Sequence, residues 1–139
     1  MMTIQEKERE LIEEFDMFDD WMDKYTYIID MGKHVCNTID IKNQDNLVAG
    51  CNSQVWLDSR FEDGKVFYRA DSDALIPKGI AQMLVRIYSG NTPLEIIEHN
   101  PVFIKEIGLE EHLSPNRANG LVSMLNKIKS IAKTYINSI

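Results

Sequence analysis

The stretch that decides the fold is Leu47-Val48-Ala49-Gly50-Cys51-Asn52-Ser53-Gln54-Val55-Trp56-Leu57. It places a cysteine between two short apolar runs, 48–49 and 55–57, and such β-branched and aromatic residues favour β-strands. The Gly-Cys-Asn-Ser segment between the runs is typical of a tight turn, because glycine supplies backbone freedom while Asn and Ser form local hydrogen bonds. We therefore predict that Cys51 is displayed at the tip of a hairpin, although free cysteine also often packs as a small buried hydrophobic residue.

A second hairpin signal follows directly. Asp63-Gly64 separates the runs 55–61 and 66–70, and Asp-Gly between two alternating runs is typical of a two-residue hairpin turn. The pattern predicts a three-stranded antiparallel meander that ends at the acidic segment 71–73. Because antiparallel neighbours alternate in direction, this segment should lie at the same end of the sheet as Cys51.

Helical patterns lie on both sides of the strands. Thr3 and Glu6 form a capping box that begins a first helix, and a second runs from about Phe18 to Gly32, where a left-handed glycine is expected to end it. Residues 33–46 are polar and irregular, which is typical of a loop. The later helices are expected over Pro77 to Ser89, from Thr92-Pro93, over 102–107 and from Ser114-Pro115 to Tyr135. We predict one domain over 1–139 with an α+β fold, in which helices cover a small three-stranded antiparallel sheet.

Charge and composition exclude several classes of partner. The chain has 15 basic and 22 acidic residues and a net charge of −7, which argues against nucleic acid or an anionic membrane surface as the main partner. Its first residues are polar and acidic, and no apolar run approaches the length of a membrane span. We therefore expect a cytoplasmic protein whose cysteines are free thiols.

Residues that could bind a metal are scattered. The candidates are His34, Cys36, Cys51, His99 and His112, with no Cys-x-x-Cys and no His-Glu-x-x-His pattern. We expect no metal site, and two cysteines are too few for an iron–sulfur cluster held by this chain alone. His99 and His112 are expected in surface or capping roles. A catalytic Cys–His pair stays open, because such partners can be distant in sequence.

Arg117 is a candidate for the site of Cys51. It lies in the first turn of the last predicted helix, where the helix dipole disfavours a cation. Such a residue either has a solvent-exposed side chain or has a functional role. Beside a thiol it could favour the thiolate, which is the nucleophilic form. The residues alone leave both interpretations open.

Three blocks together resemble a known family. They are Gly50-Cys51-Asn52-Ser53-Gln54-Val55-Trp56, Ala70-Asp71-Ser72-Asp73-Ala74 and His112-Leu113-Ser114-Pro115-Asn116-Arg117-Ala118-Asn119-Gly120. In this order and spacing they are similar to the SufE family of cysteine desulfuration proteins, the sulfur acceptors of iron–sulfur cluster assembly, and residues 27–33 also look like that family's second helix. Residues 34–37 depart from the pattern, since the family tends to have a Leu-Pro pair there, which makes Cys36 look incidental.

The resemblance implies both a fold and a function. The fold is that of IscU-type scaffold proteins. Cys51 would accept sulfur from a cysteine desulfurase of the SufS type, stimulate that enzyme and pass the sulfur to an iron–sulfur scaffold complex of the SufBCD type. This chain would hold no cofactor, because the pyridoxal phosphate belongs to the desulfurase. It is then a sulfur-transfer partner rather than a stand-alone enzyme.

On the same interpretation, further residues have supporting or partner-binding roles. They are Gly50, Ser53, Gln54, Asp71, Asp73 and Arg117. We hypothesise that the turn alternates between a tucked and an extended position, with Gly50 giving backbone freedom and Arg117 stabilising the anionic sulfur. The alternatives are a regulator that carries no sulfur, a stand-alone thiol hydrolase or peroxidase with a base near Cys51, and a cluster scaffold.

Overall fold

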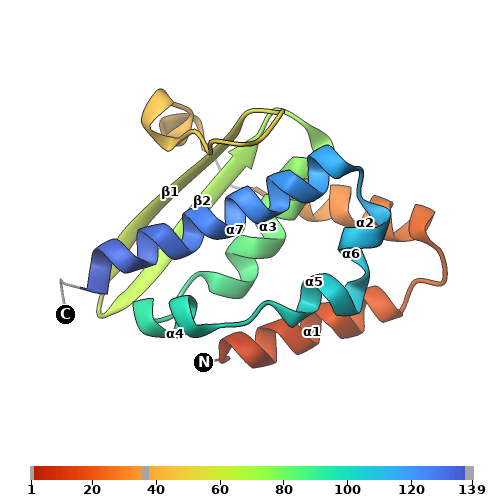
Figure 1. Cartoon of the computed structure of the whole chain (residues 1–139), viewed down its shortest axis with the longest axis horizontal. Coiled ribbons are helices and arrows are strands. Elements are labelled where there is room, and N and C mark those ends of the chain that lie inside the picture. Colours follow the sequence, from red (N-terminus) through yellow and green to blue (C-terminus); the bar gives the residue numbers. More distant parts are fainter. Residues whose placement is uncertain (1, 36–37, 137–139) are drawn as a thin grey trace.

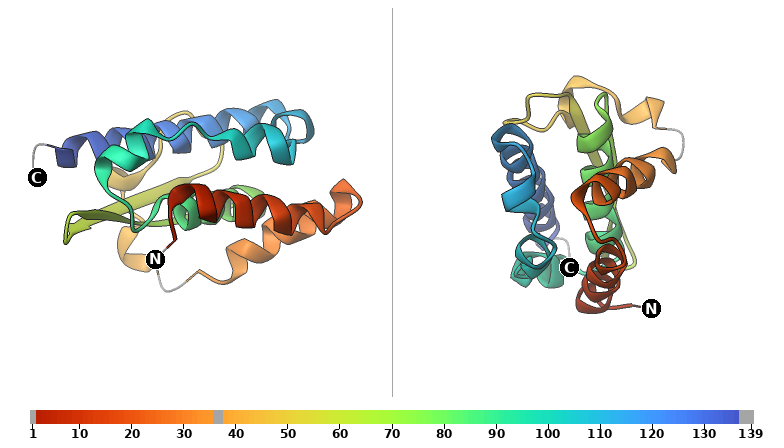
Figure 2. Two further views of the ribbon diagram at one scale, coloured as in Figure 1. Left: turned by 90° about the horizontal axis from the view of Figure 1, so that it is seen from below. Right: turned by 90° about the vertical axis from the view of Figure 1, so that its right-hand side faces the viewer.

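One helix lies at the centre of the computed structural model, which describes residues 2–35 and 38–136. This helix, α3 (Leu75–Tyr88), packs against α1 (Ile4–Asp16), α2 (Trp21–Lys33), α7 (Pro115–Ile136) and strand β2 (Lys65–Ser72), as Figures 1 and 2 show. Four residues of α3 at helical spacing form its buried face: Ile80, Met83, Leu84 and Ile87. The α+β class is therefore confirmed, and α3 joins the sheet to the helices.

The Asp-Gly hairpin forms as predicted. Strand β1 (Val55–Glu62) pairs with β2 in antiparallel register, from Val55 opposite Ser72 to Glu62 opposite Lys65. The two turn residues, Asp63 and Gly64, have φ values of 53° and 78°. Positive φ at both positions is the turn whose twist matches that of paired strands.

The predicted third strand is wrong, because the sheet of the described residues has two strands. Leu47 forms an isolated bridge with Trp56, and the Val48 amide donates to the carbonyl oxygen of Val55 at 2.8 Å. Residues 49–54, hereafter the Cys51 loop, then turn away from the sheet. Their contacts with α7 take the place of a longer ladder, so Cys51 lies in an irregular loop instead of a tight hairpin tip.

Helix α2 departs from the prediction at its start. Asp20 caps it by accepting a hydrogen bond from the Asp23 amide at 2.9 Å, so the helix begins at Trp21 and not at Phe18. Met22, which the apolar pattern of this helix would place on the buried face, is 74% exposed. The local cap thus outweighs the apolar pattern.

Gly32 does not end α2 but lies within it, at its crossing with α3. A Cβ built on Gly32 would lie 3.1 Å from the Gly79 amide nitrogen, and one built on Gly79 would lie 1.9 Å from the Ile28 carbonyl oxygen. Glycine is therefore needed for close backbone approach, and not for a left-handed helix end. The two helices pack with almost no side chain between them at this point.

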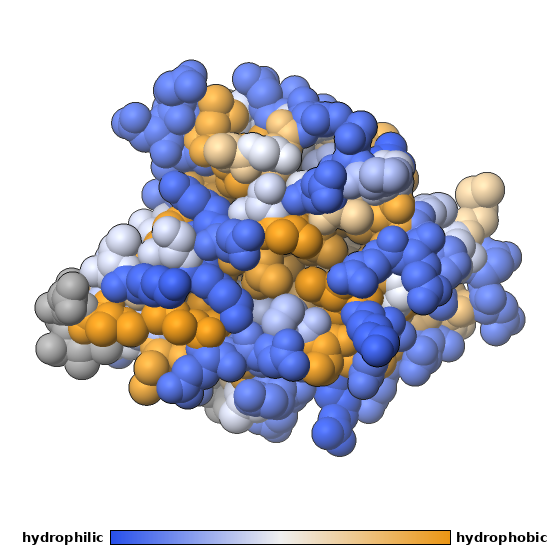
Figure 3. Space-filling view, viewed as in Figure 1, coloured by the Kyte–Doolittle hydropathy of each residue, from blue (hydrophilic) through white to orange (hydrophobic). Residues whose placement is uncertain are grey.

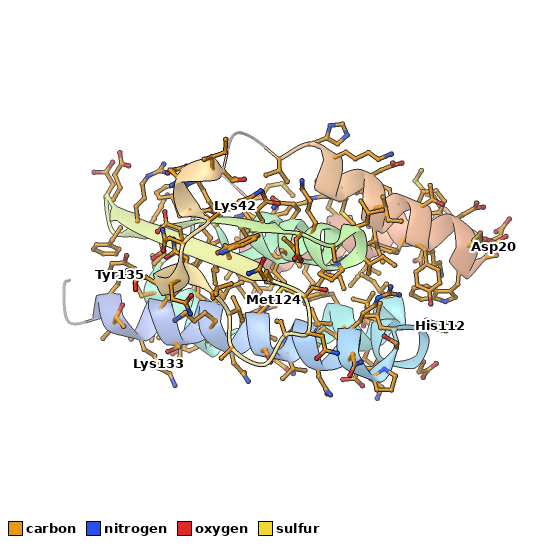
Figure 4. The ribbon with its side chains drawn as sticks, turned by 90° about the horizontal axis from the view of Figure 1, so that it is seen from above. Asp20, Lys42, His112, Met124, Lys133 and Tyr135 are labelled. Carbon is orange, nitrogen blue, oxygen red and sulfur yellow. The ribbon has the colours of Figure 1, made fainter. Side chains whose placement is uncertain are left out.

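Two short 3-10 turns interrupt the region predicted as a loop. They are η1 (Ile39–Ile41) and η2 (Gln44–Asn46) in the described part of this region, and both contact strand β1. Lys42, labelled in Figure 4, places its Nζ 5.5 Å from the centre of the Trp56 ring. This segment therefore covers the outer face of the sheet next to the Cys51 loop.

Three short helices precede α7. Helix α4 (Pro93–Glu98) packs on α7, α5 (Val102–Ile107) packs on α1, and α6 (Leu109–His112) follows the left-handed Gly108. Figure 3, in the same view as Figure 1, shows apolar side chains across the middle of the molecule, bordered by hydrophilic ones. In the part of the chain that the structure describes, no helix combines the length and apolarity that a membrane crossing requires.

The outer edge of β2 is covered by α3 and the turn that follows it. The Val66 amide donates to Asn91 at 2.9 Å and the Val66 carbonyl accepts from Gly90 at 2.8 Å. Farther along, the Tyr68 amide donates to the Ser89 hydroxyl at 2.9 Å, and the Gln82 side-chain amide donates to the Ala70 carbonyl at 2.6 Å. This edge thus has partners along most of its length.

His99 was expected in a surface or capping role. It is buried, so the surface role is wrong, but it does occupy the C-cap position of α4. Its Nδ1 lies 2.8 Å from the Tyr88 hydroxyl and its Nε2 lies 3.2 Å from a carboxylate oxygen of Glu8. The other Glu8 oxygen accepts from the Phe103 amide at 3.0 Å. These contacts join α1, α3 and α5. They give His99 a place in the core, far in sequence from its partners.

Candidate functional site

Cys51 lies at a pocket of about 380 Å³ between the first turns of α3 and of α7. The pocket has an apolar side and a polar rim. Its apolar side is formed by Val55, Pro77, Ile80 and Met124, and its rim by Asn52, Ser53, Ser114, Asn116 and Arg117. Met124, labelled in Figure 4, lies on α7 beside the Cys51 loop. A pocket of this composition can shelter a small apolar group while leaving one end polar.

The Cys51 thiol is withdrawn into this pocket. It is half-buried, and its Sγ donates to the Gly120 carbonyl oxygen at 3.7 Å. Burial raises the pKa of the thiol above its ordinary value, because desolvation disfavours the thiolate. In this position Cys51 is protonated at neutral pH and is a poor nucleophile. A chemical role therefore requires the thiol to move or its surroundings to change.

The loop that carries Cys51 is fixed at both ends. At its start the Val48 amide donates to Val55. At its end Gln54 is held three times: its amide donates to Asp73 Oδ1 at 3.0 Å, and its carbonyl accepts from the Ser72 hydroxyl at 2.7 Å and from the Asp73 amide at 3.2 Å. Residues 49–53 thus span two anchors, and movement of Cys51 needs only these residues to change conformation.

Asp71 is a buried anchor beneath this region. Its carboxylate accepts from the Thr38 hydroxyl and, at 2.7 Å, from the Ser72 amide, and it pairs with Lys42 at 3.5 Å and Lys78 at 3.4 Å. Burial alone would raise the pKa of Asp71, but these hydrogen bonds and the two cations outweigh it and hold the pKa below its usual value. The carboxylate joins η1, β2 and α3, so its evident role is structural.

We expect Asp71→Asn to lower the free energy of unfolding by about 1–3 kcal/mol near neutral pH, because it removes a buried ionised acceptor from two lysines. The pKa is lower in the folded state, so this stabilisation is present above the ordinary carboxyl pKa and is lost as the pH falls through the folded value. Urea unfolding of both proteins, at neutral pH and at acid pH, measures the difference.

Asp45→Asn is a suitable control, because Asp45 is exposed on η2. A difference between Asp71→Asn and the parent protein that stays constant from neutral to acid pH would contradict the proposed role of the charge.

The structure brings the predicted site residues into four places around Cys51. Ser53 and Arg117 lie with Cys51 at the pocket. Gln54 and Asp73 hold the base of the loop, and Asp71 lies behind it, while Gly50 faces α7. The acidic segment is thus at the Cys51 end of the sheet, as the strand directions predicted.

Two residues of α7 were not predicted to belong to this site. Gly120 accepts the hydrogen bond from Cys51, and Ser123, one turn later, meets Gly50. Small residues three positions apart on a helix form a shallow surface that allows backbone to approach. That spacing was the signal in the sequence that could have identified them.

The histidines give no base for Cys51. His99 is in the core, the His112 ring stacks on Trp21 with centroids 4.1 Å apart, and His34 follows the end of α2. None of them lines the pocket. The described residues contain no group of three or more His, Cys, Asp or Glu side chains suited to a metal ion, and Cys36 lies outside them. The Cys–His pair left open by the sequence is therefore not formed.

Comparison with known sequences gives a consistent picture. The SufE model, described as an Fe-S metabolism associated domain, matches residues 9–132. An uncharacterized SufE-like protein of Rhizobium meliloti is 40% identical over 131 residues, which cover 89% of this chain and 93% of the relative. Another from Synechocystis is 36% identical over 126 residues, covering 90% of this chain and 79% of the relative.

The fold also has a counterpart among solved structures. The solution structure of a hypothetical protein from Thermus thermophilus superposes with a TM-score of 0.77, covering 94% of this chain and 96% of that one. Its sequence identity is 21%, so the likeness concerns the fold alone.

Proposed function

The chain belongs to the SufE family, which is associated with iron–sulfur metabolism, and on this basis we propose that it accepts and carries sulfur on Cys51. The donor is the persulfide of a pyridoxal-phosphate-dependent cysteine desulfurase of the SufS type, which the protein also stimulates. The recipient is an iron–sulfur scaffold complex of the SufBCD type. One observation carries the proposal: a half-buried thiol on a loop that is anchored at both ends beside a pocket.

The transfer is a thiol exchange that needs no metal and no net redox change. The Cys51 thiolate attacks the terminal sulfur of the donor persulfide, the donor's S–S bond breaks, and a new S–S bond forms on Cys51. The donor cysteine leaves as a thiolate and takes up a proton, which balances the proton that Cys51 lost. The chain itself then requires no cofactor, and we place the exchange in the cytoplasm.

The raised pKa of the resting thiol fits a two-position mechanism. In the tucked position Cys51 is protonated and sheltered, which suppresses reaction with oxidants and other thiols. Docking on the desulfurase draws residues 49–53 outward and removes the desolvation, so that the thiolate forms beside the donor. After transfer, the loop returns, and the apolar side of the pocket shields the bound sulfur.

Arg117 is proposed to stabilise the anionic sulfur once it is formed. Arg117→Ala is expected to slow sulfur uptake by roughly tenfold, because an exposed cation at the rim of the pocket would no longer offset the charge on the persulfide. Single-turnover transfer from a loaded desulfurase measures the rate. Lys133→Ala, an exposed position on the same helix, is the charge-matched control. Equal transfer rates for the two variants would remove Arg117 from the mechanism.

Intact-protein mass after incubation with a SufS-type desulfurase and cysteine tests the proposed function. A gain of one sulfur atom that is reversed by a reductant and maps to the peptide containing Cys51 is the expected result. An unchanged mass, with the desulfurase active and stimulated, would instead identify a regulator that carries no sulfur. Thiol-dependent hydrolase or peroxidase activity in the absence of any desulfurase would point to a stand-alone thiol enzyme.

A further inference from the structure

Gly50 has one close neighbour outside its own segment. Its φ is 88°, and a Cβ built on it would lie 2.6 Å from Ser123 Oγ and 3.4 Å from Ser123 Cβ, with no other atom of residues 2–35 and 38–136 within 4 Å apart from its chain neighbours. A separation of 2.6 Å is much shorter than the contact distance of a carbon with an oxygen. The Gly50 backbone therefore lies next to the Ser123 side chain, with too little space between them for a Cβ at position 50 unless Ser123 Oγ moves.

The hydroxyl of Ser123 does not bind the loop. Ser123 is half-buried, and within the described ranges its hydroxyl makes no hydrogen bond to another residue. Its contribution to the contact is therefore its size. A residue of larger volume at this position would occupy the space that the Gly50 backbone now fills.

The next small residue toward the start of α7 receives Cys51 itself. Gly120 accepts from Sγ at 3.7 Å, and a Cβ built on Gly120 would lie 3.6 Å from that sulfur. Gly120 and Ser123 lie one turn apart and thus face the loop together. Gly120 binds the sulfur through its carbonyl oxygen, where even a Cβ would make only an ordinary contact, and Ser123 lies against the backbone just before the cysteine.

We propose that Ser123 is a positioning residue, which sets how far Cys51 is withdrawn into the pocket through its contact with the Gly50 backbone. The inference rests on the proposed function in one respect: the withdrawn position matters for sulfur transfer only if Cys51 is the acceptor. The contact itself acts on the thiol whether or not a desulfurase is present.

A double-mutant cycle of alanine substitutions tests the contact. Gly50→Ala should raise the rate of Cys51 alkylation by roughly tenfold, because the new Cβ meets Ser123 Oγ and the backbone is strained at positive φ. Adding Ser123→Ala removes Oγ and leaves only the strain, so the double variant should be roughly threefold faster than the parent protein. Effects that simply multiply, with no coupling between the two positions, would overturn the proposal.

A larger side chain gives the second test. Ser123→Leu should increase alkylation by roughly threefold or more and shift the midpoint of its pH profile downward, because the thiol loses part of its burial. Ser130→Leu, an exposed position on the same helix, is the matched control. Thermal unfolding identifies a variant that does not fold, in which case the alanine cycle decides alone. Equal rates and equal pH profiles for two folded leucine variants would overturn the proposal.

The alkylation assay uses no desulfurase, so it separates this inference from the proposed function. Coupling between Gly50 and Ser123, together with no sulfur uptake by any variant, would contradict the acceptor role and leave the contact standing. Sulfur uptake by the parent protein, without any coupling between Gly50 and Ser123, would instead support the acceptor role and contradict the role of the contact.

Discussion

Cys51→Ser is expected to reduce sulfur uptake to below about one percent of that of the parent protein, because a serine hydroxyl is not ionised at neutral pH and does not attack sulfane sulfur. The variant should fold normally, since oxygen replaces one sulfur atom that is only half-buried. Intact mass after incubation with the desulfurase and cysteine measures uptake, and thermal unfolding measures the fold.

Cys36→Ser is the matched control for this variant, since it exchanges the same atoms at the other cysteine and should retain uptake. Stimulation of the desulfurase is recorded in parallel. The Cys51→Ser protein could stimulate the desulfurase as strongly as its parent and support the same sulfur flux to the scaffold. That result would show that the protein is a regulator and not a sulfur carrier.

Gly79→Ala should destabilise the fold by about 3 kcal/mol or more, the upper range for overpacking, since the added Cβ would lie 1.9 Å from the Ile28 carbonyl oxygen. Backbone atoms cannot turn aside as a side chain can, so α2 and α3 must separate. The separation would loosen the helix that carries Pro77 and Ile80 at the pocket. The free energy of unfolding in urea gives the size of the effect.

Gly32→Ala, at the other glycine of the α2–α3 crossing, gives a loss of stability with which that of Gly79→Ala can be compared. Its Cβ would lie 3.1 Å from Gly79 N and from the flexible Lys78 side chain, so a smaller loss of about 1 kcal/mol is expected. Asn126→Ala, at an exposed position of α7, is the control, because it introduces alanine into a helix without a steric clash. Similar stabilities for Gly79→Ala and Asn126→Ala would show that the crossing is not closely packed.

Features that depend on a few neighbouring residues could be predicted from the sequence. The capping box of Thr3 and Glu6 forms with both of its hydrogen bonds, and Asp63-Gly64 makes its turn. Each is decided by backbone preferences and by groups three or fewer positions apart. The same holds for the strand directions, which placed the acidic segment at the Cys51 end of the sheet.

Features that depend on distant contacts could not be predicted in this way. The third strand fails because Gly50 and Cys51 meet α7, about seventy positions later, and a period-two pattern carries no such information. His99 is buried because Glu8 reaches it across 91 positions. Gly32 resembles a helix stop, and only the approach of Gly79 shows that it serves packing. Resemblance to a family singled out Cys51 as the proposed acceptor, but it gave no indication of the Ser123 side chain that lies against the loop.

The covered edge of β2 has a consequence for how the protein behaves in a concentrated solution. A strand with open amides and carbonyls can recruit a strand from another molecule, and this is a common start of aggregation. Here Ser89, Gly90, Asn91 and Gln82 already occupy those groups on β2. A very small sheet can therefore remain unextended on this side, because residues of the same chain block pairing with a strand of another molecule.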